Sequence, residues 1–364
     1  MTLENLALFE THNLPIRHVG DVHNGKVRSV YWLTPEDSKR LSSGYNLRAD
    51  TKLGVMVISD RISAFEVIWQ GEDGLMGVPG KGAVLNAISK HWFDRLNEEG
   101  IAGNHILDVP HPLVWIVQKA EPIMIEAVAR QYIAGSMWRD YDEKGIRNFC
   151  GNVLPEGLKK DQKLTELILT PTTKGTLRGI PGVPEEDDTN ITRGQILANY
   201  SRFGFWVPSH VDQYEQLSRE GFHLIARDLD SIAQIFIDTK FEFGYIRNED
   251  GSVRMIYIDE AGTPDSSRIY HKKSYEQGKV VESSKEPFRQ FLIAKTDRDI
   301  LLKKKRMPER IELAKTYRVP VDEMMEVSRV YADIAMQIIG KPVPEIHDAH
   351  AEILDALSPY GLVA

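Results

Sequence analysis

Acidic and basic residues alternate along the stretch FIDTKFEFGYIRNEDGSVRMIYIDE, residues 236–260. Successive side chains of a strand point to opposite faces, so Asp238, Lys240 and Glu242 are predicted to share one face. The alternate positions are apolar and we expect them to be buried; they are Ile237, Phe241 and Phe243. The stretch therefore predicts a strand that presents an acid, a base and an acid in a row.

The pair Asp250-Gly251 predicts a two-residue turn into a second strand. That turn would place Glu242 opposite Asp259, and directly opposed like charges destabilise a sheet pair. A divalent cation between them would remove the conflict, because Mg2+ is usually held by one or two carboxylates together with water and nucleotide phosphates. Two alternatives stay open: a solvated face on which Lys240 pairs with its neighbours, and a register shifted along the strand.

Two further stretches combine residues that suit phosphate or carboxylate recognition. GTPDSSRIY brings Asp265 and Arg268 together with hydroxyl groups in one turn. NGKVRSVY places Gly25 before Lys26 and Arg28, so that backbone and basic side chains could approach a phosphate. Each stretch, read alone, is also an ordinary turn with surface charges.

The stretch ARQYIAGSMWRDY predicts a helix that begins near Ser136, which is a plausible N-cap, with Arg130 upstream. Free amide groups at a helix N-terminus attract anions, although an ordinary capped helix would have the same sequence. Lys174 and Arg289 are further basic candidates.

Hydrophobic periodicity indicates the elements that position these residues. Short antiparallel strands are expected between residues 24 and 71, a helix in GKGAVLNAISKHWFDRLNEEG that stops at Gly100, and a helix over 211–229. In VDEMMEVSRVYADIAMQIIG we expect Asp322 as cap and Gly340 as stop. Its predicted inward positions are Met325, Val327, Val330, Tyr331, Ile334 and Ile338. Residues 151–193 are rich in proline and glycine and predict a long loop.

Composition bounds the class of protein. The 364 residues predict two domains, and the net charge of -8 argues against a general nucleic-acid binder. Cys150 is the only cysteine, so no intrachain disulfide can form, which favours a cytoplasmic location. Its thiol is expected to be inert. We find neither a secretory signal pattern nor an apolar run long enough for a membrane span, so no membrane partner is expected.

Several strings together resemble the SAICAR synthetase family, in the family's order from about residue 25 to residue 340. They include GKVRSVY, SDRISAFEVI, PGKGAVLNAISKHWF, ARQYIAGSMWRDY, DTKFEFG and DEAGTPDSSRIY. The resemblance implies an α+β fold. Residues 1–121 would form an antiparallel lobe similar to a protein-kinase small lobe, covering ATP. Residues 122–364 would form a larger α+β domain that carries the metal and ribonucleotide sites and the C-terminal helices.

The resemblance implies a ligase that uses ATP and Mg2+ to join L-aspartate to the carboxylate of carboxyaminoimidazole ribonucleotide (CAIR) through an acyl phosphate. Gly25, Lys26 and Arg28 would cover ATP, and Glu242 and Asp259 would hold Mg2+. The ribonucleotide phosphate would be bound by Arg130, Ser136 and Arg268. Around the reacting carboxylate the resemblance implies Asp238, Lys240 and Asp265 as catalytic residues. Arg289 and Lys174 would be further substrate-binding residues there.

Three positions depart from the family pattern: Ser29 and Glu66 stand where aspartate is usual, and Met124 replaces a proline. The departures at Ser29 and Glu66 prompt a second hypothesis, a nucleotide-binding regulatory protein on the same scaffold. A third hypothesis is a related ligase with another amine or imidazole acid. The sequence leaves the oligomeric state open.

Overall fold

Two antiparallel sheets and the helices around them make up the computed structural model, which describes residue 3 and residues 6–364. The first sheet has the order β1-β2-β3-β7-β6. Its strands are β1 (His23–Asn24), β2 (Arg28–Trp32), β3 (Leu53–Ile58), β7 (Val114–Gln118) and β6 (Ile106–His111). A small hairpin of β4 (Ile62–Ala64) and β5 (Val67–Trp69) follows β3. The expected short strands of this segment are confirmed.

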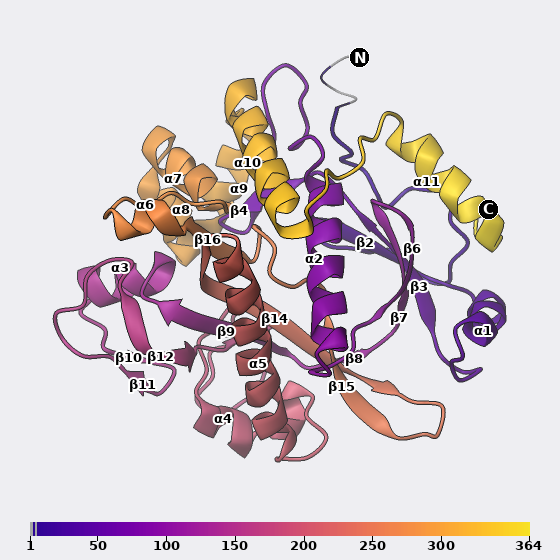
Figure 1. The fold of residues 1–364 in the computed structure, drawn as a ribbon, viewed down its shortest axis with the longest axis horizontal. Helices are drawn as coiled ribbons and strands as arrows, with labels where there is room; N and C mark the ends of the chain where they lie inside the picture. Colours follow the sequence, from indigo (N-terminus) through magenta and orange to yellow (C-terminus); the bar gives the residue numbers. More distant parts are fainter. Residues whose placement is uncertain (1–2, 4–5) are drawn as a thin grey trace.

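The second sheet has β14 (Gln234–Arg247) near its centre. Its main path is β12-β9-β14-β15, formed with β12 (Lys163–Leu169), β9 (Ile125–Tyr132) and β15 (Val253–Ile258). Three shorter strands join it: β8 (Glu121–Pro122), β13 (Thr172–Thr173) and β16 (Ser267–His271). A separate pair consists of β10 (Asn148–Phe149) and β11 (Asn152–Val153). In Figure 1 the first sheet lies to the right of α2 (Lys81–Glu98), and most of the second lies to its left.

Helices cover both sheets and make up the C-terminal part of the chain (Figure 1). The earlier ones are α1 (Pro35–Gly44), α3 (Gly135–Glu143), α4 (Arg193–Ala198) and α5 (His210–Ser231). The later ones are α6 (Lys272–Glu276), α7 (Glu286–Lys295), α8 (Arg298–Leu302), α9 (Met307–Thr316), α10 (Val321–Ile339) and α11 (Ala349–Leu357). The mixture of helices with antiparallel sheets confirms the α+β class.

The three long helices predicted from periodicity are confirmed as α2, α5 and α10. Gly100 and Gly340 follow two of them with φ of 72° and 76°, a left-handed conformation that glycine adopts without steric cost. Two details of α10 were wrong. Pro320 rather than Asp322 occupies the N-cap, because the helix already begins at Val321. Its inward face includes Met324, which is 0% exposed, whereas Met325 is 42% exposed.

The prediction of a loop across residues 151–193 was wrong in part. The segment contributes β12 to the second sheet, where Ile168 and Leu169 pair with Arg130 and Ala129 of β9. Pairing with a distant strand supplied the order that the local composition did not predict. Residues 175–188 contain no helix or strand.

One apolar core joins the two halves of the chain. Buried side chains from β3, α2, α5 and β14 belong to a single cluster, and α2 packs against α10. The strands divide between β7, which ends at Gln118, and β8, which begins at Glu121. We keep a domain boundary between residues 121 and 122 as a proposal that this change of sheet supports. No helix among the described residues is long and apolar enough to cross a membrane.

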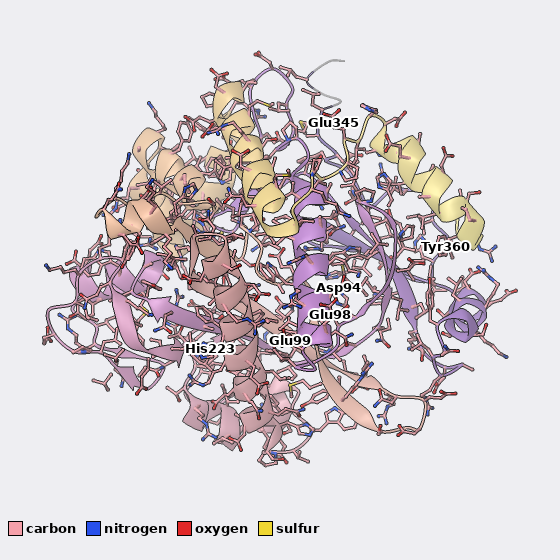
Figure 2. The ribbon with its side chains drawn as sticks, in the orientation of Figure 1. Asp94, Glu98, Glu99, His223, Glu345 and Tyr360 are labelled. Carbon is pink, nitrogen blue, oxygen red and sulfur yellow. The ribbon has the colours of Figure 1, made fainter. Side chains whose placement is uncertain are left out.

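The C-terminal segment packs on the first sheet. Helix α11 contacts β6, and Ile353, Leu357 and Leu362 are buried. Tyr360, labelled in Figure 2 beside the end of α11, donates its hydroxyl to Asp108 at 2.6 Å. The last residues also pair with the N-terminal segment, where the backbone of Ala364 donates to Pro15 at 2.8 Å.

Candidate active site

Two adjoining hollows are lined by residues from both sheets. The arginine hollow, about 410 Å³, contains Arg130, Arg139 and Arg268, and the carboxylate hollow, about 770 Å³, contains Glu242 and Asp259. We call the shared part the junction; it is lined by Lys26, Ser63, Asp188, Lys240, Asp265, Ser266, Lys285 and Arg289. All thirteen site residues predicted from the sequence line one hollow or both.

The charged face of β14 lies in these hollows. The ammonium of Lys240 donates to Glu126 at 2.8 Å and to Glu242 at 3.0 Å. Burial lowers the pKa of Lys240, but the carboxylates of Glu242 and Glu126 outweigh burial and raise it well above its usual value. Burial also raises the pKa of Glu126 to about 7. Lys240 therefore carries a fixed positive charge between two carboxylates.

The apolar face of β14 is less regular than the alternation predicted. The register shifts between Phe236 and Asp238, where β14 pairs with β16. As a result Ile237 packs with Tyr132, Ala134 and Tyr270 in a separate cluster, away from the main core. The prediction that Ile237 shares a buried face with Phe241 and Phe243 was therefore wrong, because the shift adds a residue to the strand.

The predicted pairing of Glu242 with Asp259 was also wrong. Asn248 donates its backbone N–H to Ser252 at 2.8 Å, which leaves a three-residue loop instead of a two-residue turn at Asp250-Gly251. Gly251 takes the left-handed position of that loop, with φ of 83°. Glu242 consequently pairs with Ile258. Asp259 follows the end of β15, and its φ of 63° is also left-handed.

Glu242 and Asp259 nevertheless line the same hollow. Glu242 forms ion pairs with Lys174 and Lys240, and Asp259 lies 3.3 Å from a guanidinium nitrogen of Arg28. Burial raises the pKa of Asp259, but Arg28 and the two lysines outweigh it and lower the pKa to about 2, so the carboxylate is ionised. Among the described residues, no group of three or more His, Cys, Asp or Glu side chains could hold a metal. The two carboxylates fit an Mg2+ ion that completes its shell with phosphate and water.

The loop before β2 brings three cleft residues into place. Gly25 donates its backbone N–H to Arg28 at 2.8 Å, which closes the turn around Lys26. Arg28 reaches across the carboxylate hollow to Glu260 at 3.0 Å as well as to Asp259. The loop of the first sheet is thereby tied to the end of β15.

In the arginine hollow, Asp238 holds two arginines. Its Oδ2 accepts from Arg130 at 2.8 Å and from Arg268 at 2.7 Å. Arg268 also donates to Glu286 at 3.0 Å, and these carboxylates raise its pKa although burial lowers it. Two guanidinium groups beside each other suit a phosphate.

Helix α3 places Ser136 at this hollow, although not as its N-cap. The helix begins at Gly135, and the N-cap position is Ala134, which makes no side-chain hydrogen bond. Gly135 has φ of 56°, and a Cβ atom there would lie 2.2 Å from Nη2 of Arg268. The prediction that Ser136 caps the helix was therefore wrong, because the helix begins at Gly135 and Ser136 lies inside its first turn.

The carboxylate of Asp265 is contacted by three side chains from distant parts of the chain. Lys81 of α2 lies 3.0 Å from its Oδ2 and Lys285, before α7, lies 3.2 Å from the same atom. Tyr331 of α10 donates to Oδ1 at 2.7 Å. Burial raises the pKa of Asp265, but Lys285 and Lys81 outweigh it, so the pKa lies well below its usual range.

The family model of SAICAR synthetase matches residues 21–301, well over half of the chain. The chain belongs to the SAICAR synthetase family.

Curated relatives match over their full length. Proteins of Vibrio campbellii and Vibrio cholerae, both called phosphoribosylaminoimidazole-succinocarboxamide synthase, are each 56% identical over 367 residues, with 100% of both chains covered. Among solved structures, SAICAR synthase from Saccharomyces cerevisiae complexed with SAICAR is 25% identical with a TM-score of 0.64. That match covers 92% of this chain and 99% of the yeast chain.

Sequence reasoning missed some residues of this SAICAR synthetase cleft. Arg139 and Lys285 line it, as does Glu126, which holds Lys240. Arg139 follows Ser136 by three residues, so helical spacing could have identified it. Lys285 gave no comparable signal, because its partner Asp265 lies in another element.

Ser29 in β2 and Glu66 in the β4–β5 turn, the two departures from aspartate, both make side-chain contacts. Ser29 exchanges hydrogen bonds with Thr11 at 2.7 Å and Asn24 at 3.0 Å. Glu66 forms an ion pair with the buried Arg310 at 3.1 Å. Cys150 remains unremarkable: burial raises the pKa of its thiol to about 11, which fits the expected inert role.

Proposed function

We propose that this protein is an ATP-dependent ligase that joins L-aspartate to the carboxylate of CAIR, giving SAICAR, ADP and phosphate in purine biosynthesis. The observation that carries the proposal is the full-length identity of 56% to synthases of this name. The cleft supports it chemically, since paired carboxylates, lysines and arginines line two joined hollows. We further infer a cytoplasmic location, which the single cysteine supports.

The reaction explains why such residues are needed. A carboxylate resists attack by an amine, because an oxide would have to leave. ATP converts it to an acyl phosphate, and the neutral amine of aspartate then forms the C–N bond. Phosphate departs with the electron pair of the broken C–O bond and can accept the proton that the amine nitrogen loses. Negative charge moves through the site during phosphoryl transfer, so fixed cations stabilise the transition state.

The residues divide these tasks along the cleft. Gly25, Lys26 and Arg28 would cover the nucleotide phosphates from the first sheet. Lys240 would neutralise the transferring phosphoryl group, and Lys174 would assist it from the carboxylate hollow.

Glu242 and Asp259 would hold Mg2+, which when bound supplies charge neutralisation at the phosphates. Their ion pairs with lysine and arginine hold both side chains in the carboxylate hollow.

At the other end, Arg130, Arg268 and Ser136 would bind the ribonucleotide phosphate. Asp238 would orient the two arginines that it already holds. Arg289 would line the transfer site at the junction. Asp265 remains a predicted catalytic residue, although its three contacts favour a role in holding the lysines beside it.

The test is release of ADP that requires L-aspartate, CAIR and Mg2+ together. Absence of turnover by pure, folded protein would contradict the proposal. If calorimetry then shows ATP binding without product, the regulatory alternative, prompted by Ser29 and Glu66, gains support. Turnover with a different amine in a substrate screen would favour a related ligase.

Replacement of Glu242 tests the metal pair. Glu242→Gln is expected to lower kcat roughly 10²- to 10³-fold, because one anionic ligand is lost. Its effect on the thermal midpoint should be small, since Lys240 keeps its bond to Glu126 and the side chain of Lys174 is 34% exposed to water. Glu249→Gln, an exposed acid in the β14–β15 loop, is the control. Parallel losses of kcat and stability would argue against a catalytic position for Glu242.

A further inference from the structure

Asp265 neutralises only one of the two lysines that contact it. Lys81 is 0% exposed and lines neither hollow. Among the described residues, its only ion-pair partner is Asp265. Tyr331 satisfies the other carboxylate oxygen. Lys285 shares Oδ2 with Lys81, and its other acidic neighbour, Glu260, is already paired with Arg28. Two ammonium groups therefore share the one carboxylate that lies within ion-pair distance of both.

Of these two lysines, Lys285 is the one that reaches the cleft. Lys285 is 7% exposed and lines the junction of both hollows. Burial lowers the pKa of Lys285 to about 8, against the attraction of Asp265, and Arg289 and Lys81 add to the decrease. An anion placed next to this ammonium would stabilise its charged form.

Arg289 adds a second cation one helical turn further along α7. Its guanidinium lies 3.2 Å from Glu286, but the same carboxylate oxygen already accepts from Arg268 at 3.0 Å. Arg130, Arg268 and Arg289 form a linked network whose ion pairs, among the described residues, involve two carboxylates, those of Asp238 and Glu286. Arg289 is the member of this network that lines the junction.

A dicarboxylate fits this pair better than the other substrates do. Lys26 and Arg28 approach the nucleotide end from the first sheet, and Arg130 and Arg268 lie together around Asp238 in the arginine hollow. Lys285 and Arg289 lie on one side of the junction, where both hollows meet. A nucleophile must enter there to reach a group activated at one end and anchored at the other.

We propose that Lys285 and Arg289 bind the two carboxylates of L-aspartate and so direct its amine toward the activated carboxylate of CAIR. The proposal rests on the proposed ligase function. It assigns Asp265, Lys81 and Tyr331 to positioning Lys285.

The test compares steady-state constants for all three substrates. Lys285→Met removes the charge and keeps a chain of similar size, and Asp265 retains Lys81 and Tyr331. We expect KM for L-aspartate to rise roughly ten- to hundredfold, as for a lost charged hydrogen bond. KM for ATP and CAIR should stay within about twofold. Lys285→Arg should restore part of the affinity.

Two further variants keep the test decisive. Lys295→Met removes an exposed charge at the last residue of the same helix and should leave all three KM values unchanged. Arg289→Gln should raise KM for L-aspartate by a similar factor, and it serves if Lys285→Met does not fold. Wild-type protein without turnover would refute the ligase itself. An active wild type whose Lys285 and Arg289 variants keep KM for L-aspartate, or instead raise KM for CAIR or ATP, would overturn the aspartate site.

Discussion

Gly135 is predicted to be required by the position of Arg268. The residue has φ of 56°, and an added Cβ would lie 2.2 Å from Nη2, 2.5 Å from Cζ and 2.9 Å from Nη1 of that arginine. A guanidinium is the end of a flexible side chain, but this one is held by Asp238 at 2.7 Å and Glu286 at 3.0 Å. Gly135→Ala must therefore displace a group that is fixed by two ion pairs.

The expected loss has two parts. An alanine in the left-handed conformation costs about 1–2 kcal/mol relative to glycine. Loss of a charged hydrogen bond adds about 1.5–3 kcal/mol, and not more, because Asp238 keeps Arg130 and Glu286 keeps Arg289. We therefore expect Gly135→Ala to reduce the free energy of unfolding by about 2.5–5 kcal/mol.

Gly145 provides a matched control near the other end of α3. Its φ of 66° is similar, and no atom lies within 4 Å of an added Cβ. Gly145→Ala should lose only the backbone part, about 1–2 kcal/mol. Denaturant unfolding of both variants isolates the contribution of Arg268. In addition, kcat/KM for CAIR should fall in Gly135→Ala alone. Equal stability losses, with kcat/KM for CAIR kept in both variants, would refute the reasoning.

Two paired substitutions test the C-terminal helices. Met324→Ala in α10 should lower the free energy of unfolding by about 2–5 kcal/mol because Met324 is fully buried, whereas Met325→Ala should change it by less than about 0.5 kcal/mol. In α11, Leu357→Ala should lower the thermal midpoint, because Leu357 is buried in the packing of this segment. Asp355→Ala should not lower it, because Asp355 is exposed. Similar midpoints for Leu357→Ala and the unmodified chain would show that α11 does not stabilise the first sheet.

The elements that sequence predicted best are those in which local pattern and tertiary packing agree. In α2, Leu85, Ile88, Trp92 and Leu96 recur at helical spacing and all are buried. In α10 the inward face was predicted one residue out of phase at its start, because Met324 and Met325 are chemically identical. Burial distinguishes them, since Met324 is fully buried and Met325 is exposed.

The hairpin shows why register is harder to predict than strand identity. Asp250-Gly251 supports a two-residue turn and equally a three-residue loop with glycine in the left-handed position. One additional loop residue moved Glu242 from Asp259 to Ile258. The two carboxylates still reached one hollow, because Asp259 leaves the strand in a left-handed conformation.

Residue types at the site could be predicted from short strings, but their partners could not. Arg28 contacts Asp259 and Glu260, which are 231 and 232 residues away. The turn around Asp265 suggested phosphate or carboxylate recognition, yet the contacts of Asp265 come from α2, α10 and the start of α7. Such pairings depend on how distant elements pack, and no local pattern encodes them.

This distinction decides which substitutions are informative. Removal of the Asp265 carboxylate would leave the ammonium groups of Lys81 and Lys285 buried without their shared partner. Such uncompensated charges strongly destabilise a protein, so a loss of turnover in that variant would not identify a catalytic role. Lys285 can lose its charge while Asp265 keeps Lys81 and Tyr331. A change in kinetics at Lys285 therefore reports on the cleft, whereas a change at Asp265 reports first on the packing that supports it.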